Sequence, residues 1–176
     1  MEGEMNHSEE LFKIVNVETL SENVFTLIDK DWMLITAGNG ENLNTMTASW
    51  GGLGILWHRR VAFVFVRPSR YTYQFMEDED LFSLSFFGGN FREALNLCGT
   101  VSGRDVDKVD KAGLTPARRE NGGIYFQEAS LVFICKKLYF DDLRPELFLD
   151  PAIEDNYPKK DYHRMYIGEI IEVLKK

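Results

Sequence analysis

The chain has 176 residues, a length that suits one domain, because chains divide into several domains mainly above roughly 250 residues. Hydrophobic residues make up 44% and charged residues 27% of the composition, which excludes a disordered chain. The 28 acidic residues outnumber the 20 basic ones, and the resulting net charge of -8 argues against nucleic acid or an anionic membrane as partner. We expect one domain over residues 1–176, with residues 1–20 as a flexible lead-in.

The cysteines and the apolar runs indicate where the protein resides. Cys98 and Cys135 are far apart in sequence and lie among apolar residues, so two buried free thiols in a reducing cytosol is a simpler interpretation than one disulfide. The acidic N-terminus shows no apolar signal-peptide segment. The apolar run Val61–Val66 is far shorter than the roughly 20 residues that span a bilayer. We therefore expect a cytoplasmic protein without a membrane span.

The first half of the chain predicts three strands. Trp32–Ala37 forms the first, and Gly38-Asn39-Gly40 provides turn residues after it. The threonine-rich segment Leu43–Trp50 is the second strand and ends at two glycines. Val61–Val66 has no polar face, so we expect this third strand to be buried on both sides.

The next segment alternates between helix and strand. Pro68 ends the preceding strand, and Ser69 is placed to cap a helix over Arg70–Glu77. Leu81–Phe87 is predicted as a strand with Phe82, Leu84 and Phe86 on one face and Ser83 and Ser85 on the other. Asn90–Leu97 has helical spacing, and Gly99 is predicted to stop that helix.

A further short helix around Val106–Ala112 and two long strands, Ala129–Phe140 and Arg164–Leu174, complete the prediction. The helices are too few and too short to serve as crossovers between parallel strands. The sequence therefore favours a mainly β fold, an antiparallel barrel with short helices.

The motifs of several enzyme classes are missing from the sequence. Leu43 stands where a dinucleotide fingerprint needs its third glycine, and neither a phosphate-binding loop nor a nucleophile elbow occurs. His7, His58 and His163 are too far apart for zinc spacing. The acidic run at 77–80 lacks the alternating spacing of a calcium loop. We expect no metal site.

Positive charge is concentrated in one part of this acidic chain. Residues 42–76 contain no Asp or Glu, yet they contain four arginines, at positions 59, 60, 67 and 70. The same stretch is rich in hydroxyl side chains, and Arg67–Thr72 places two guanidinium groups at a strand end that leads into a helix. Such a helix start binds anions, and arginine adds bidentate recognition. In the competing interpretation, Arg59 and Arg60 are solvated at a hairpin and Arg67 and Arg70 pair with the nearby acidic run.

Four segments in order resemble the flavin reductase-like, FMN-binding split-barrel family, which includes flavoredoxin. They are Asn44–Trp50, VAFVFVRPSRYTYQ at 61–74, Ser102–Lys108, and Tyr162–Glu169, the last similar to the family's DHxxxxGE strand. Together they cover nearly the whole chain, from Trp32 to Leu174. The resemblance implies a homodimer of six-stranded antiparallel Greek-key barrels, with FMN near the subunit interface.

The resemblance also implies which residues contact the cofactor. The strand residues contact the isoalloxazine ring, the segment Arg67–Thr72 holds the phosphate, and Ser102 and Arg104 reach the phosphate or ribityl chain from either subunit. His163 matches the position at which related reductases place a histidine near the nicotinamide, although Tyr162 stands before it and displaces Asp161 by one residue. The full set predicted for the cofactor is Met46, Thr47, Ala48, Ser49, Trp50, Arg67, Ser69, Arg70, Thr72, Ser102 and Arg104.

The expected activity is that of an FMN-dependent oxidoreductase, which passes electrons from NADH or NADPH through FMN to an unidentified acceptor. A flavin-binding or electron-carrier module without turnover is the alternative. A third possibility is a split-barrel dimer that binds another anionic ligand, such as a phosphorylated vitamin or haem.

Overall fold

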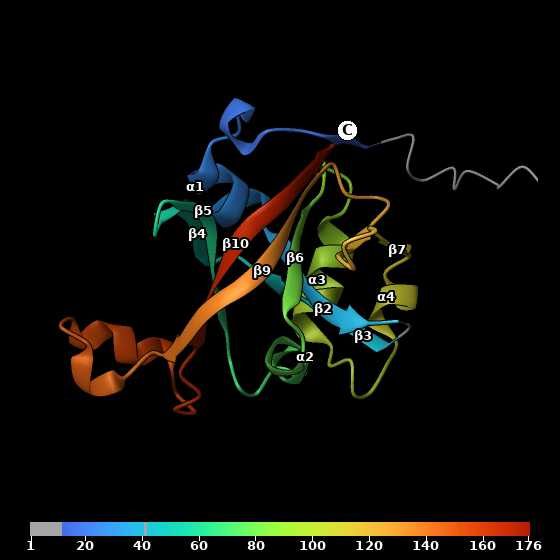
Figure 1. Cartoon of the computed structure of the whole chain (residues 1–176). Helices are drawn as coiled ribbons and strands as arrows, with labels where there is room; N and C mark the ends of the chain where they lie inside the picture. The colour runs from blue at the N-terminus through green and yellow to red at the C-terminus, as the bar shows by residue number, and fades with distance from the viewer. Residues whose placement is uncertain (1–11, 41) are drawn as a thin grey trace, which may run out of the picture.

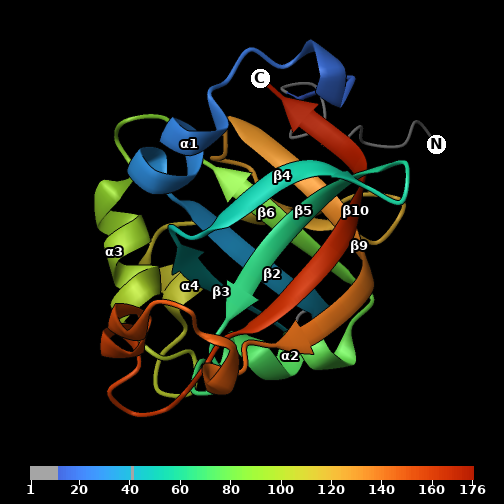
Figure 2. The same cartoon turned by 90° about the vertical axis from the view of Figure 1, so that its left-hand side faces the viewer.

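The structure, a computed structural model, describes residues 12–40 and 42–176. Its main element is an antiparallel sheet of eight strands, in the order β3-β2-β6-β9-β10-β5-β4, with the two-residue strand β1 paired to β10. The sheet curves so that β4 and β5 lie across from β2 and β3 (Figure 2). The mainly β, antiparallel split-barrel architecture is thus confirmed, with eight strands in the sheet where the resemblance implied six.

The strands and helices have the following bounds in chain order. The strands are β1 Lys13–Ile14, β2 Met33–Asn39, β3 Asn42–Ala48, β4 Gly51–Leu56, β5 Arg59–Val66, β6 Leu81–Phe86, β7 Pro116–Arg118, β8 Ile124–Phe126, β9 Leu131–Asp142 and β10 Arg164–Lys175. The helices are η1 Val17–Thr19, α1 Val24–Thr26, η2 Leu27–Asp31, α2 Thr72–Asp78, α3 Arg92–Thr100, α4 Lys108–Lys111, η3 Pro145–Leu147 and η4 Pro151–Asn156. Of the predicted lead-in, residues 12–20 contain β1 and η1, and residues 1–11, with His7, lie outside the described residues.

The main core lies inside the curved sheet and follows the period of two that the strands predict, and a second buried cluster, which includes Leu34, Val132 and Ile134, lies on the other face of β2 and β9. Phe82, Leu84 and Phe86 of β6 point into the core, as expected from their alternation with serines. In β5 the same alternation sends Ala62, Val64 and Val66 inward. Phe63 and Phe65 on the opposite face are only half-buried, so the prediction that this strand is buried on both sides is wrong.

Two predicted helix boundaries are also wrong. The residue before α2 is Tyr71, without a side-chain cap, because the Ser69 hydroxyl instead donates to Asp161. Gly99 lies within α3 and does not stop it. The thiols of Cys98 and Cys135 are buried and free, as predicted. None of the helices in the described part of the chain has the length and apolar character needed to cross a bilayer.

The connection between β3 and β4 positions the candidate site. These strands are consecutive in sequence but lie at opposite ends of the sheet order, and only Ser49 and Trp50 join them. The segment 143–163 between β9 and β10 extends away from the sheet, at the lower left of Figure 1. The β3–β4 connection, the start of α2 and the end of the 143–163 segment meet at one place, which is described next.

Candidate functional site

A cavity of about 210 Å³ opens beside the β3–β4 connection. It gathers residues that are more than 100 positions apart in the sequence, because the C-terminal ends of β3, β5 and α3 and the N-terminal end of β10 all lie near it. Its lining residues are Met46, Thr47, Ala48, Ser49, Trp50, Phe65, Arg67, Arg70, Gly99 and His163. The whole predicted strand segment 46–50 is therefore brought together with Arg67, Arg70 and His163.

Arg70 is the cationic side chain at the helix side of this cavity. Its guanidinium donates to the backbone oxygen of Gly99 at 2.8 Å and, more weakly, to that of Cys98 at 3.4 Å. These carbonyls belong to the C-terminal turn of α3, whose partial negative charge favours a cation. Burial, and then the neighbouring Arg67, lower the pKa of Arg70. An anion in the cavity would offset both effects.

Lys108 reaches the same helix end from the other side. Its ammonium donates to the backbone oxygens of Cys98 at 3.2 Å and Val101 at 3.3 Å, and the side chain is buried. Burial, and then Arg70, lower the pKa of Lys108 to about 8. The half-buried Arg70 and the buried Lys108 thus share one helix terminus, and within residues 12–40 and 42–176 neither of them pairs with a carboxylate, which is an arrangement suited to an anionic ligand.

Arg67 and Ser69 contact a carboxylate of the protein itself. Arg67 donates to Asp161 at 2.9 Å and to the backbone oxygen of Asn156 at 2.9 Å, and Ser69 donates to Asp161 at 2.8 Å. The guanidinium also lies 4.8 Å from the ring centre of Tyr157. Neither arginine of this segment pairs with the acidic run at 77–80, so this part of the competing interpretation is wrong. Its other part agrees with the structure, since Arg59 and Arg60 are exposed at the β4–β5 hairpin.

Thr72, Ser102 and Arg104 lie away from the 210 Å³ cavity. The buried Thr72 hydroxyl accepts a hydrogen bond of 2.8 Å from the Asn44 amide. Ser102 accepts from the backbone N–H of Arg104 at 3.2 Å, and the Arg104 guanidinium lies 4.8 Å from the ring centre of Tyr71. This loop borders a separate cavity of about 320 Å³, lined by Asn44, Tyr71, Gly103 and Lys108 among others.

His163 closes the 210 Å³ cavity on the side of the 143–163 segment. Its Nδ1 atom is hydrogen-bonded to the Tyr157 hydroxyl at 2.7 Å. Its ring lies against Trp50, with 5.3 Å between ring centres, and edge-on to Phe65 at 6.4 Å. Burial, and then Arg67, lower the pKa of His163 to about 4, while Asp161 acts in the opposite direction. The imidazole is therefore neutral near pH 7.

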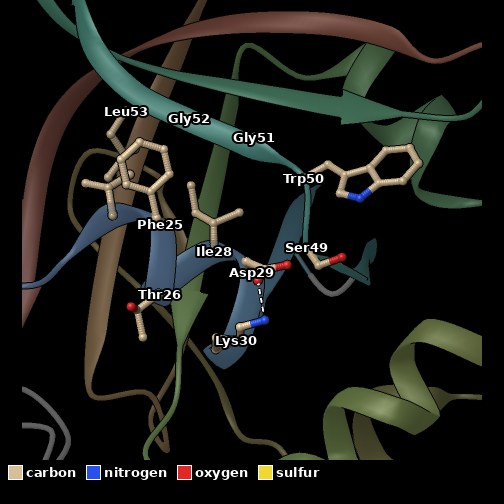
Figure 3. A pocket seen from close by; sticks show the side chains of 11 residues that line it. Phe25, Thr26, Ile28, Asp29, Lys30, Ser49, Trp50, Gly51, Gly52 and Leu53 are labelled. Atoms are coloured by element: carbon tan, nitrogen blue, oxygen red, sulfur yellow. Dashed lines mark ion pairs between the residues drawn. The ribbon is translucent and has the colours of Figure 1, made fainter. Parts of the chain in front are cut away.

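A larger, mostly apolar cavity of about 780 Å³ shares Ser49 and Trp50 with the first (Figure 3). Figure 3 shows Phe25, Ile28 and Leu53 gathered at one end and the Asp29–Lys30 ion pair at the rim. Gly51 is required at its wall, because its φ of +155° is unfavourable for other residues and a Cβ would lie 2.8 Å from a backbone oxygen of β5.

Sequence reasoning missed the residues that complete both cavities. Phe25 lies in α1, lines the larger cavity and is 84% exposed. The only sequence signal for this short helix is its N-cap, Asn23. Gly99, Phe65 and Tyr157 reach the first cavity or His163 from distant segments and carry no local signal. No cluster of three potential metal ligands occurs within residues 12–40 and 42–176.

Comparisons with known proteins agree with this architecture. The profile of the flavin reductase like domain matches residues 27–175. The comparison with curated proteins gives no match.

Three solved structures illustrate the similarity of fold. Flavoredoxin from Methanosarcina acetivorans is 21% identical, with a TM-score of 0.64 over 83% of this chain and 68% of its own. The FMN-binding protein from Thermus thermophilus with bound p-hydroxybenzaldehyde is 19% identical, with a TM-score of 0.64 over 82% of this chain and 71% of its own. The NADH:FAD oxidoreductase of Streptomyces globisporus C-1027, in complex with NAD and FAD fragments, is 16% identical, with a TM-score of 0.63 over 83% and 74%.

Proposed function

The chain belongs to the family defined by the flavin reductase-like domain, and from this premise we propose that it binds FMN and passes electrons from NADH or NADPH to an acceptor. The observation that carries the proposal is the pair of adjoining cavities at the β3–β4 connection. One has the half-buried cations Arg67 and Arg70 at its wall, and the other is broad and apolar. FMN combines these two requirements in one molecule, a phosphate and a flat ring system.

The residues present fit FMN in their chemistry. Arg70 and Arg67 are the proposed phosphate contacts, and Arg67 would then share its guanidinium between the ligand and Asp161. The backbone and hydroxyls of Met46–Trp50 are proposed to hold the isoalloxazine ring, and the small Ala48 permits close approach. Thr72 is a less suitable phosphate contact because its hydroxyl is buried on Asn44. Ser102 and Arg104 could contact the FMN of their own subunit only from the other side of Tyr71, or they could contact the FMN of the partner subunit.

When bound, FMN supplies the redox chemistry, accepting a hydride equivalent from a nicotinamide and releasing electrons to an acceptor. The protein contributes positioning. Trp50 and Phe65 enclose His163, and this neutral imidazole is the proposed contact for the dihydronicotinamide. No side chain needs to act as a general acid or base, because hydride transfer is governed by the approach of the two rings.

A homodimer is part of the proposal, supported by an apolar face on the outside of the sheet. The pairs Phe63–Ile167 and Phe65–Met165 between β5 and β10 lie on the face opposite the core. Trp57 extends this face and is 54% exposed, with its ring beside that of Tyr139. Interface cores favour such aromatic residues.

The free buried thiols support a location in the reducing cytoplasm.

The test is the cofactor and its reduction. Purified protein is denatured with acid and the released compound is identified by mass; FMN is expected, and FAD alone or no flavin would contradict the assignment. Anaerobic addition of NADH or NADPH then separates a reductase, whose flavin bleaches, from a flavin-binding module, whose flavin bleaches only with dithionite.

A further inference from the structure

The hydrogen bond between Tyr157 and His163 joins two buried side chains of the same segment. Tyr157 follows η4 and His163 directly precedes β10, and the two are 3% and 7% exposed. The Tyr157 hydroxyl lies 2.7 Å from Nδ1 of His163. A buried bond of this length between two rings fixes the orientation of both.

The chemistry of the two groups decides which of them donates. A phenol is a stronger acid than the N–H of a neutral imidazole, and an imidazole nitrogen is a better acceptor than a phenol oxygen. Burial raises the pKa of Tyr157, which keeps its proton available for donation. When Nδ1 accepts, the single hydrogen of the neutral imidazole resides on Nε2.

The Tyr157 ring is held from several sides. The Arg67 guanidinium lies 4.8 Å from its centre, and Arg67 also donates to the backbone oxygen of the preceding Asn156. Phe148 stacks on the ring at 6.0 Å between centres, and Tyr162 packs against it at 4.9 Å. The phenol therefore has little freedom to turn away from His163.

The other nitrogen of His163, Nε2, is free to contact a ligand. Within residues 12–40 and 42–176 it forms no hydrogen bond and is not a fully buried unpaired atom, and the ring lines the 210 Å³ cavity beside Trp50. The charged and titratable groups around the imidazole are Arg67, which directly follows β5, and Asp161 and Tyr157 from its own segment. Arg67 opposes a second positive charge there, and burial has the same effect, so the imidazole stays neutral.

We propose that Tyr157 is a positioning residue that holds His163 as the neutral Nε2–H form, so that the cavity presents a fixed hydrogen-bond donor to an uncharged oxygen acceptor of the ligand. The ligand class is a flat compound with an amide or carbonyl oxygen. In the function proposed above, on which this last step rests, the acceptor is the carboxamide oxygen of the nicotinamide.

The form of the imidazole is measured by long-range proton–nitrogen correlation NMR on the FMN-loaded protein. In the wild-type protein we expect an unprotonated Nδ1 and a protonated Nε2, unchanged between about pH 5.5 and about pH 8. In Tyr157→Phe the two neutral forms should become mixed. Tyr162→Phe is the matched control, because its hydroxyl donates to Glu154 and not to His163; it should leave the spectrum of His163 unchanged.

The kinetic arm measures reduction by NADH. Tyr157→Phe should raise the KM for the nicotinamide about 3- to 10-fold, the effect of one neutral hydrogen bond, and leave the affinity for FMN unchanged. A protonated Nδ1 in the wild-type protein, or an unchanged Nε2–H form in Tyr157→Phe, overturns the proposal. If Tyr157→Phe does not fold, the wild-type spectrum and its pH dependence decide. If the spectra are as expected but neither nucleotide reduces the flavin, the positioning role stands and the proposed reductase function fails.

Discussion

Arg70→Ala separates the phosphate contribution to binding from the rest of the cofactor. Arg70 lines the cavity while its guanidinium rests on the carbonyls of Gly99 and Cys98, so it is held in place before any ligand arrives. A charge-assisted hydrogen bond contributes about 1.5–3 kcal/mol, which corresponds to roughly 10- to 150-fold in affinity for FMN. Arg59→Ala is the matched control, because Arg59 is half exposed and pairs with Glu169 away from the cavity.

Titration of the apoprotein with FMN or riboflavin, monitored by the quenching of flavin fluorescence, measures the affinity of each variant for both ligands. Riboflavin lacks the phosphate but keeps the ring, so Arg70→Ala should weaken FMN binding by that factor and change riboflavin binding by less than about 3-fold, the effect of a fraction of a kcal/mol. Arg59→Ala should change neither by more than this. Equal losses in the two variants, or an equal loss of riboflavin and FMN in Arg70→Ala, would refute the assignment of Arg70 to the phosphate.

Three further predictions concern stability and assembly. The pKa of His163 in the folded protein, about 4, lies below its ordinary value of 6.5, so between these pH values only the unfolded chain takes up this proton. The free energy of unfolding should therefore fall by about 1–3 kcal/mol as the pH drops from about 6.5 to about 4. Urea titrations of His163→Asn should lack this part of the pH dependence. Gly168→Ala should destabilise the fold by about 1–3 kcal/mol, because the added Cβ would lie 2.5 Å from the buried Phe82 ring. In the control Gly88→Ala the added Cβ meets nothing within 4 Å, so stability should change by less than about 0.5 kcal/mol. Similar losses in both variants would contradict the packing described. Light scattering at micromolar concentration should give the mass of a dimer, and Trp57→Lys should shift it toward the monomer; a monomer with FMN still bound would contradict a site shared between subunits.

The parts of the fold that the sequence predicts are those with a short-range pattern. The alternation in Leu81–Phe86 identifies the strand face that enters the main core, although the serines on the other face are buried too, and the antiparallel pairing follows from the shortage of helices. Strand β4 was missed because Gly51–Leu56 contains three glycines and shows no alternation. The half-buried outer faces of Phe63 and Phe65 were missed because a continuous apolar run does not reveal that one of its faces lies outside the core.

The candidate site divides in the same way. Met46–Trp50 forms one wall because residues that are consecutive in the sequence remain together in any fold. The partners of Arg67 and Ser69 could not be predicted, since Asp161 is more than 90 residues away and only the pairing of β5 with β10 brings it close. Tyr157 is likewise a site residue only because the 143–163 segment returns toward the sheet.

The central claim is that the two cavities hold a flavin that a nicotinamide can reduce. It is tested most directly by mixing the FMN-loaded protein with NADH or NADPH under anaerobic conditions and following the visible absorbance of the flavin in a stopped-flow instrument. The account predicts bleaching within seconds by at least one nucleotide, slowed in His163→Ala while the affinity for FMN is nearly unchanged. Protein that binds no FMN, or bound flavin that only dithionite reduces, would contradict it.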